Sequence, residues 1–578
     1  MPGAREENCS GPRELAGATR STLGTRGIFF RLWRIRSFNR TIRTRGRERP
    51  RRTEKKPLNY AETSLNAFAR VRSVTCIGLH ALGVDIEVQI VSALRRFSIV
   101  GLPDGVLRES KERVRCAIEN SGVPFPEGEV IVSLGPASIK KYGSGFDLPI
   151  AVGILAAQGV LRVDSLEHCI VVGELALDGG IKMVPGVLLA CHYAKEQGFQ
   201  SLIIPAGTEA EASLIDGVLA YSVDSLAQCI ALLRGERTLE AVPTRLPEIS
   251  DLTLQPTFSD VVGQHRAKRA LEVAAAGGHH LLMIGPPGAG KSMLATRLPS
   301  ILPALTPTEV IEVTKVYSVL DERRQFLSSG QGGRQRVTNE RPVRAPHHSI
   351  SAAGLFGGGS EPMPGEISLA HKGVLFLDEF PEFRRDAIEA LRQPLESREV
   401  EIGRARLHLT FPADFLLVVA MNPCPCGKRG LRAGNCQCSR TAIARYRSKV
   451  SAPLLDRIDL QLWVAPVPVV ELGRAPTSDT TAEMRSRVER ARDIQRARYG
   501  SAELVNGRLA PTEMKQFCKL EQKAKTLLQG AAEKFELSAR GWTRVLKVSR
   551  TIADLEASEQ ICASHVSEAL SYRLVDVF

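Results

Sequence analysis

Eight consecutive residues have the composition of a loop that wraps phosphate groups. The run GPPGAGKS fits the spacing G-x-x-x-x-G-K-[ST], follows the apolar segment LLMI and precedes the helix-like segment MLATRL. Glycines at such a turn let backbone N–H groups surround an anion where a helix begins, while the lysine neutralises phosphate charge and the hydroxyl binds Mg²⁺. The residues expected to hold a nucleotide are Gly285, Pro286, Pro287, Gly288, Ala289, Gly290, Lys291 and Ser292.

Two carboxylates and one amide stand at the ends of apolar runs further along the chain. GVLFLDEF ends with Asp378 and Glu379, and FLLVVAMN ends with Asn422. Asp378 is placed to hold Mg²⁺, and Glu379 to orient and polarise an attacking water. The Asn422 amide is suited to contact the γ-phosphate or that water, and the alternative for it is a turn residue at a strand end. Together with the phosphate loop, these residues predict ATP hydrolysis.

Two arginines follow in the order that a subunit-bridging ATPase site requires. Arg457 in SAPLLDRIDL is expected on a short loop, from which a neighbouring subunit inserts an arginine finger. Arg540 in LSARGWTRVL is expected near a helix start, within reach of the nucleotide. Solvated surface arginines are the alternative, and their position after the other motifs favours the catalytic role.

Four cysteines are clustered, whereas the other eight are scattered singly as is typical of reduced thiols. The spacing C-x-C-x9-C-x-C suits a closed tetrahedral Zn²⁺ site more than a disulfide pair. The expected ligands are Cys424, Cys426, Cys436 and Cys438. Lys428, Arg429 and Arg432 lie inside this loop with no acidic residue, which indicates a nucleic-acid contact. The alternative is a rigid spacer.

Hydrophobic periodicity and composition divide the chain into five segments. Residues 64–235 switch between periods of 2 and 3.6, which predicts an α+β or α/β domain, and the runs LLMIG, VLFLDE and FLLVVAMN predict parallel strands covered on both faces. The fold class is therefore α/β, a P-loop domain with a parallel sheet and a helical C-terminal lid, behind an N-terminal α+β domain. The expected segments are a disordered basic arm (1–62), the N-terminal domain (63–235), a linker (236–257), the ATPase core (258–475) and the lid (476–578).

The net charge of +14 comes mainly from the basic arm. Residues 1–56 hold sixteen Lys or Arg and five Glu, which leaves 61 basic and 58 acidic residues elsewhere. DNA binding must therefore be argued from local patches. The arm itself is suited to nucleic-acid contact or targeting, or is an extension without a task. No run approaches the length of a membrane helix and no secretory signal begins the chain, so we expect a cytoplasmic protein.

With these motifs, the chain resembles the YifB/ComM family of magnesium-chelatase-like AAA+ ATPases over about residues 64–575. The resemblance rests on RPVRAPHHSISAAGLFGGGSEPMPGEISLAHKGVLFLDEFPEF, on MNPCPCG and on SAPLLDRIDL. It implies a homo-hexameric ring with Mg·ATP between subunits. In the family's terms Asp378 and Glu379 match Walker B, Asn422 sensor 1, Arg457 the finger and Arg540 sensor 2, acting in cis or in trans.

The resemblance also implies two projections from the core. The segment HHSISAAGLFGGGSEPMPG, neither helix nor strand in pattern, corresponds to the helix-2 insert, a loop that projects into the pore. EVEIGRARLHLTF (399–411) predicts a hairpin around Gly403 and Arg404, matching the hairpin before sensor 1. Arg404 and Arg406 are suited to phosphate contact, or are solvated charges on an exposed turn. His347 and His348 are interpreted as structural histidines.

The N-terminal domain looks like the domain of Lon-type proteases, which use a serine activated by a lysine. The serine position falls at Gly145, with Ser144 one residue early, and GVLLACHYA lacks the lysine. We therefore expect a ring-assembly or DNA-docking module. The family implies an ATP-driven DNA motor, most like the branch-migration helicase of natural transformation and recombination. The alternatives are a magnesium-chelatase ATPase subunit and a Lon-like protein remodeller or protease.

Overall fold

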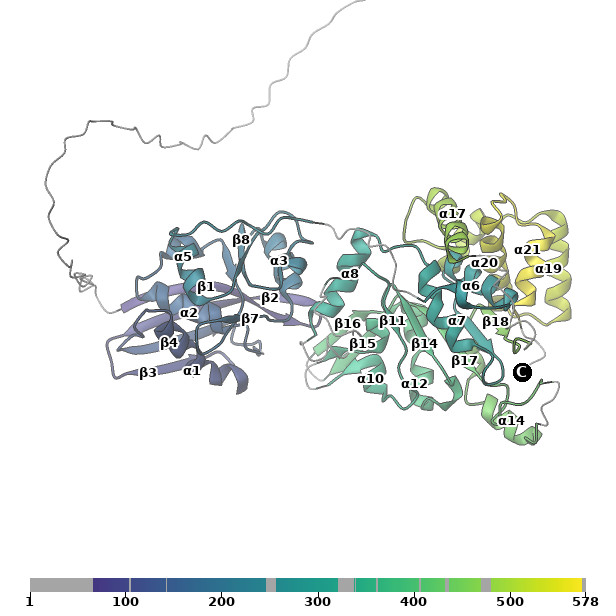
Figure 1. Cartoon of the computed structure of the whole chain (residues 1–578), viewed down its shortest axis with the longest axis horizontal. Coiled ribbons are helices and arrows are strands. Elements are labelled where there is room, and N and C mark those ends of the chain that lie inside the picture. The colour runs from purple at the N-terminus through teal and green to yellow at the C-terminus, as the bar shows by residue number, and fades with distance from the viewer. Residues whose placement is uncertain are drawn as a thin grey trace, which may run out of the picture. The chain divides into compact units, whose positions relative to one another are not determined.

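A computed structural model describes most of the chain after the basic arm (Figure 1). The described residues are 66–102, 105–141, 143–245, 256–320, 337, 339–359, 362–404, 407–431, 436–468 and 480–573. The arm predicted at 1–62, Arg406 and Arg432 lie outside them, as does the side chain of Arg404. All described residues belong to one compact unit, Ser64–Phe578.

The N-terminal domain is built on a seven-stranded mixed sheet with the order β3-β4-β2-β1-β5-β8-β9. β1 and β2 pair antiparallel along their whole length, whereas β5, β8 and β9 are parallel neighbours. This mixture fits the predicted α+β domain. The strands are β1 (Asn66–Ile77), β2 (His80–Val91), β3 (Arg96–Val100), β4 (Glu129–Gly135), β5 (Cys169–Val171), β8 (Ser201–Pro205) and β9 (Leu219–Val223), with a separate pair β6 (Glu174–Leu175) and β7 (Ile181–Lys182).

Helix α2 (Asp147–Ala157) lies in the core of this domain, because every one of its residues is buried. Its apolar run packs on β1 and β2, and the buried Asp147 carboxylate accepts a hydrogen bond of 2.7 Å from Arg113 Nε. The remaining helices are α1 (Gly105–Asn120), η1 (Val163–Leu166), α3 (Val187–Gln197), α4 (Glu209–Ala212) and α5 (Leu226–Leu233).

The second sheet is wholly parallel, with the order β11-β14-β17-β10-β18. Every residue of β10 (Leu281–Ile284), β14 (Val374–Leu377) and β17 (Leu416–Met421) is buried, which confirms the prediction from the three apolar runs. The edge strands are β11 (Val343–Arg344) and β18 (Leu460–Trp463). Around the sheet lie η2 (Phe258–Asp260), α6 (His265–Gly277), α7 (Lys291–Arg297), η3 (Leu298–Ile301), α8 (Pro307–Ser318), α11 (Glu366–Leu369), η4 (Phe380–Glu382), α12 (Arg385–Ala390), α13 (Arg392–Ser397), α14 (Arg440–Arg447) and α15 (Ala452–Leu455).

The two predicted projections differ in detail from their sequence patterns. The segment expected to be neither helix nor strand contains α10 (Ala352–Phe356), which the Ser351 side chain caps, and the short pair β12 (Gly357–Gly358) and β13 (Met363–Pro364). The hairpin is present as β15 (Glu399–Arg404) and β16 (Leu407–Pro412). The turn was wrongly placed, because Gly403 and Arg404 continue the strand ladder opposite His408 and Leu407.

The C-terminal part is helical, as predicted, and shares one hydrophobic core with the parallel sheet. A bridge between Leu520 and Ile561 separates the two helices that follow Ala510. The elements are α17 (Thr481–Tyr499), η5 (Asn506–Arg508), α18 (Pro511–Phe517), α19 (Gln522–Lys534), α20 (Ala539–Leu555) and α21 (Ala563–Ser571). None of the described helices is both long and apolar enough to cross a membrane.

Charged residues just before the strands connect the sheet to the lid. His279, which precedes β10, contacts Asp459 Oδ2 at 2.9 Å and Thr551 Oγ1 of α20 at 2.8 Å. Asp414, which precedes β17, pairs with Arg508 of η5. The amino edge of the sheet therefore holds the lid by ionic and hydrogen-bonded contacts.

A fully buried ion pair stabilises the lid itself. Arg550 and Asp554 are both inaccessible, and the Asp554 carboxylate also accepts hydrogen bonds from Arg498 and from Asn506 Nδ2 at 2.7 Å. Removing one member of such a pair leaves a buried charge without its partner, which costs more than the pair contributes.

We predict that Asp554→Ala lowers the free energy of unfolding of the lid by about 3–5 kcal/mol. Urea unfolding followed by circular dichroism measures the change. Arg496→Ala is the control, because its pair with Asp493 is solvent-exposed and is expected to contribute under about 1 kcal/mol. Equal stabilities for the two variants would contradict the assignment.

Candidate nucleotide site and cysteine cluster

The phosphate loop connects β10 to α7 in a conformation that depends on glycine. Gly288 and Gly290 have φ of +76° and +85°, and a Cβ at either would meet no atom within 4 Å. Gly285 is required for a different reason, since a Cβ there would lie 2.3 Å from the carbonyl oxygen of Val464. The loop therefore turns tightly beside β18 and faces open space, as a phosphate cradle must.

Lys291 is the buried cation of this loop. Its side chain donates to the carbonyl oxygens of Gly285 and Pro286 at 2.7 and 3.0 Å and to Asn422 Oδ1 at 3.3 Å. Burial lowers the pKa of Lys291, while the carboxylates of Asp378 and Glu379 oppose that shift. The amide at the end of β17 therefore lies next to the lysine, as expected for groups at adjacent carboxyl ends of a parallel sheet.

Ser292 and Asp378 lie in direct contact. Ser292 Oγ donates to Asp378 Oδ2 at 2.6 Å, and the backbone N–H of Glu379 donates to Asp378 Oδ1 at 2.8 Å. A hydroxyl beside a carboxylate, with a lysine close by, is the donor set that fits Mg²⁺ bridged to a nucleotide. These residues therefore fit the implied cofactor.

Glu379 lies in a strained backbone conformation against a residue that the sequence did not connect to it. Its φ is +49°, and its Oε2 lies 3.2 Å from His348 Nδ1. The parallel register explains the contact: Arg344 of β11 is opposite Leu375 of β14, and four residues further on these strands lead to His348 and Glu379. The register of these two strands, and not the composition of the segment, identifies His348 as a neighbour of Glu379.

Arg457 and Arg540 lie together on a different carboxylate. Arg457 pairs with Glu396 of α13, and Arg540 Nη2 lies 3.9 Å from the same Glu396 Oε1. Arg457 Nη1 also donates to the carbonyl oxygen of Pro453 at 2.5 Å. Among the described residues, Arg457 and Arg540 therefore share one carboxylate partner, and neither contacts Lys291. The sequence did not indicate Glu396 as that partner.

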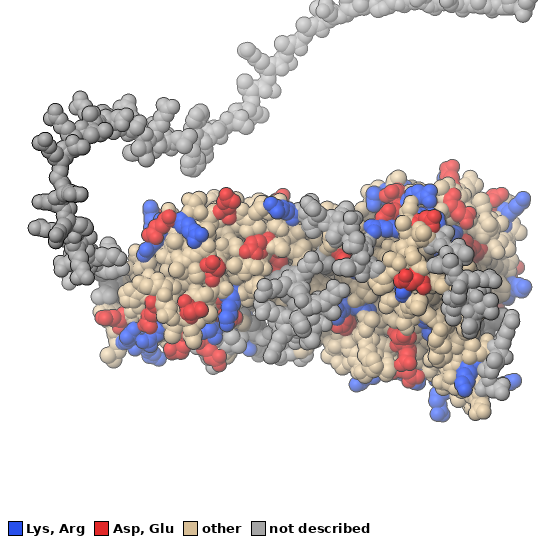
Figure 2. Space-filling view, viewed as in Figure 1, with Lys and Arg blue, Asp and Glu red and all other residues tan. Residues whose placement is uncertain are grey.

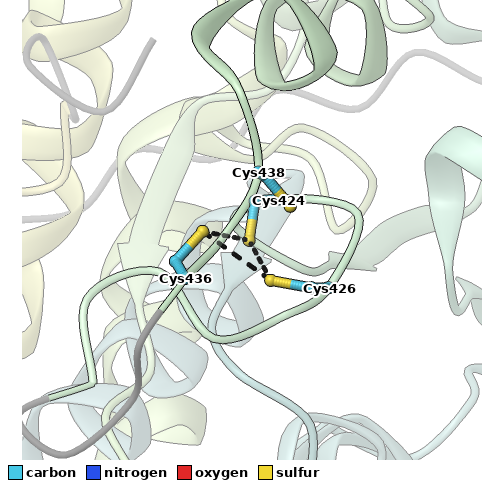
Figure 3. Close-up of side chains that lie close together, drawn as sticks. All are labelled: Cys424, Cys426, Cys436 and Cys438. Carbon is cyan, nitrogen blue, oxygen red and sulfur yellow. Dashed lines mark hydrogen bonds between the residues drawn. The ribbon is translucent and has the colours of Figure 1, made fainter.

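The four clustered cysteines converge on one point (Figure 3). Their sulfurs all lie within 4.8 Å of one another, and Cys424 Sγ lies 3.4 Å from Cys426 Sγ and 3.6 Å from Cys436 Sγ. These separations are too long for a disulfide bond, and all four thiols are free. Four thiolates around Zn²⁺ at the usual Zn–S distance are about 3.8 Å apart, so the cluster fits that ion.

The thiols are held in unequal environments. The backbone N–H of Lys428, followed by the thiol of Cys438, lowers the pKa of Cys426 to about 6, whereas the pKa of Cys438 is raised to about 11. A thiolate at Cys426 near neutral pH provides a first ligand for a metal ion, because the thiolate is the ligating form.

Among the described residues, neither Lys141 nor Lys182 is hydrogen-bonded to the Ser144 hydroxyl. The Ser144 hydroxyl donates to the Glu174 carboxylate, and Lys182 Nζ lies 3.8 Å from the same carboxylate. Lys141 is buried and donates to the carbonyl oxygen of Leu134 at 2.9 Å. Each lysine is therefore engaged with an acceptor other than the serine, which argues against activation of Ser144.

Comparison with known families assigns the class. Three family models match successive parts of the chain: subunit ChlI of Mg-chelatase at residues 86–208, magnesium chelatase, subunit ChlI at 257–472, and magnesium chelatase, subunit ChlI C-terminal at 478–573. With the parallel P-loop sheet and the helical lid, these matches define an AAA+ ATPase of the magnesium-chelatase-like type.

Individual relatives narrow this class. The chain is 40% identical over 507 residues to the uncharacterized protein YifB of Escherichia coli and 41% identical over 512 residues to the competence protein ComM of Haemophilus influenzae. Each alignment covers 88% of this chain and 97% of the relative. Lon protease 2 of Bacillus subtilis is 28% identical over 214 residues, or 33% of this chain and 36% of the protease. The protein belongs to the YifB/ComM family of magnesium-chelatase-like AAA+ ATPases.

We predict that the purified protein contains one zinc ion per chain and that Cys424→Ser with Cys436→Ser removes it. Elemental analysis measures the metal, and the loss should also lower the melting temperature, because metal binding contributes to folding. Cys116→Ser, outside the cluster, is the control and should keep the ion. A metal-free wild-type protein prepared without chelators would rule out the zinc site.

Proposed function

We propose that this protein is an ATP-driven DNA motor, a homo-hexameric helicase that moves branched DNA during natural transformation and homologous recombination. The observation that carries the ATPase part is the convergence of Lys291, Ser292, Asp378, Glu379 and Asn422 at the carboxyl edge of one parallel sheet. The DNA part is supported by the relative named competence protein ComM and by the basic residues of the cysteine loop.

Each residue of the site has a distinct task in this proposal. Lys291 binds the β- and γ-phosphates, and Ser292 and Asp378 hold Mg²⁺, which neutralises charge on the phosphates when bound. Glu379 orients the attacking water with its carboxylate, and the Asn422 amide positions that water or the γ-phosphate. These assignments are supported by the contact of Lys291 with Asn422 and by that of Ser292 with Asp378.

In this proposal Arg457 completes a site in the neighbouring subunit, and Arg540 acts on a nucleotide in cis or in trans. Both arginines contact the Glu396 carboxylate, which supports this assignment. A guanidinium group that binds a carboxylate is also suited to bind phosphate oxygens. In a ring, Arg457 reaches a phosphate group across the interface. The ring then couples nucleotide binding in one subunit to the position of the next.

The four cysteines hold a structural Zn²⁺ in this proposal. Their loop follows Asn422 directly, so a closed metal site stiffens the segment between Asn422 and α14. The ion has no part in hydrolysis.

A magnesium-chelatase subunit is the second candidate, favoured by the family descriptions and by a 28% identity over 177 residues to the magnesium-chelatase 67 kDa subunit of Chlorobaculum parvum. The ATPase rate with single-stranded DNA, branched DNA, unfolded protein or no polymer separates the candidates. Only a DNA motor is expected to be stimulated by DNA.

We predict that Glu379→Gln binds ATP but neither hydrolyses it nor unwinds branched DNA, because an amide cannot accept a proton from the water. Nucleotide binding, phosphate release and strand separation on a fluorescent branched substrate measure the three steps. The rate should fall by about 100-fold or more.

Glu536→Gln is the matched control, because Glu536 is also a glutamate with positive φ, at +48°, but lies in the lid. It should hydrolyse ATP at the wild-type rate. Full unwinding by Glu379→Gln would refute the assignment of Glu379.

A further inference from the structure

The segment that contains the cysteines continues into the most one-sidedly charged part of the core. Residues 422–450 include no Asp or Glu and seven Lys or Arg: Lys428, Arg429, Arg432, Arg440, Arg445, Arg447 and Lys449. Arg432 lies outside the described residues. The rest of the chain after the arm is nearly balanced in charge, so this segment differs from its surroundings.

Five of these cations are exposed, and the four other than Lys449 form a surface from the cysteine loop to α14, which we call the knuckle surface. No carboxylate of the described residues pairs with any of them, whereas Lys449 is paired with Glu382 at 2.9 Å. Figure 2 shows blue side chains over α14, at the lower right edge of the molecule. The knuckle surface consists of Lys428, Arg429, Arg440 and Arg445.

The protein holds like charges together at this surface. Burial, followed by the nearby positive charge of Arg429, lowers the pKa of Arg447. Arg429 comes from the cysteine loop and Arg447 from the last turn of α14. The cysteine loop and α14 thus bring positive charge close together.

The cysteine loop also touches the phosphate loop directly. Gly427 has a φ of +72°, and a Cβ at this position would lie 2.5 Å from Pro287 Cδ. Gly427 therefore packs against Pro287 more closely than a residue with a Cβ atom could. A displacement of the cysteine loop must therefore shift the phosphate loop, because close-packed contacts transmit small shifts.

A second contact joins α14 to Asn422. Ile443 and Tyr446 form the buried side of α14, where burial raises the pKa of Tyr446 to about 12 and the nearby backbone of Asn422 opposes that shift. Asn422 in turn accepts the hydrogen bond from Lys291. The knuckle surface is therefore linked by one contact to the phosphate loop and by another to the amide at the end of β17.

We propose that the knuckle surface binds the phosphate backbone of a single DNA strand and that this binding stimulates ATP hydrolysis through Gly427 and Tyr446. The proposal rests on the proposed function and adds both the contact surface and the route to the nucleotide site. A polyphosphate backbone is the complementary ligand, because its anions can pair with four exposed cations that no carboxylate of the described residues binds, and because such pairing needs no base-specific group.

The test of binding uses the full chain and a fluorescent oligo-dT strand, with affinity measured by anisotropy at several salt concentrations. The triple variant Arg429→Ala, Arg440→Ala, Arg445→Ala should bind at least about tenfold more weakly, and its slope of log affinity against log salt should be smaller by about 2. Arg162→Ala with Arg496→Ala, two exposed arginines elsewhere, is the control and should bind like the wild type. The triple variant should keep the wild-type zinc content, which shows that the cysteine loop is intact.

The test of transmission is Tyr446→Phe, which removes only the hydroxyl. It should bind oligo-dT normally, while its ratio of DNA-stimulated to basal ATPase rate falls at least about fivefold, equivalent to one hydrogen bond of about 1 kcal/mol. Tyr221→Phe in β9 should keep the wild-type ratio.

The outcomes separate this inference from the proposed function. A wild-type protein that neither binds nor responds to DNA overturns both. A wild-type protein that binds DNA and is stimulated by it, together with a triple variant of equal affinity and salt slope, overturns the knuckle surface alone. Unchanged stimulation in Tyr446→Phe overturns the assigned route through Tyr446.

Discussion

The parallel pairing of three buried strands between two edge strands is the constraint on which the nucleotide site depends. β14, β17 and β10 are apolar at every position, so they must be covered on both faces and cannot slide without exposing core residues or breaking the ladder. Parallel strands bring the residues after their carboxyl ends to one edge. Lys291, Asp378 and Asn422 are distant in sequence and meet there because the strand register leaves no other place for them.

The same geometry gives the two edges of the sheet different chemistry. The carboxyl edge carries the phosphate loop, the two carboxylates and the amide, and faces open space at Gly288 and Gly290. The amino edge carries His279, Asp414 and Asp459, whose partners come from the lid. Buried charges at the amino edge are paired with residues of the lid, whereas the Glu379 side chain at the carboxyl edge is half-exposed and contacts His348. The amino edge of the sheet therefore carries the ionic groups that connect it to the lid, and the carboxyl edge carries those of the candidate nucleotide site.

The features that could be predicted from the sequence are those that depend on residues close together in the chain. The three buried strands and the sulfur cluster were predictable, since continuous apolar runs and close cysteine spacing are read from neighbouring residues. α10 was missed because its glycine-rich surroundings hide a single capped turn. The contact of His348 with Glu379 was not predictable, because β11 has only two residues and no apolar run marks its register. Glu396 could not be distinguished from other exposed glutamates, and the approach of Gly427 to Pro287 depends on a turn that only the folded chain defines.

One consequence concerns β17, which carries Asp414 at its start and Asn422 at its end. Asp414 is bound to the lid through Arg508, and Asn422 is bound to Lys291. A six-residue strand fixed in the middle of a packed sheet is a stiff strut, about 20 Å long. If the lid adopts two positions that differ at Arg508, the free-energy coupling between lid position and nucleotide affinity must be equal in both directions. A protein or nucleic acid that binds one lid position more tightly would then change the affinity of the chain for nucleotide. Bound nucleotide would change the affinity of the chain for that partner by the same factor.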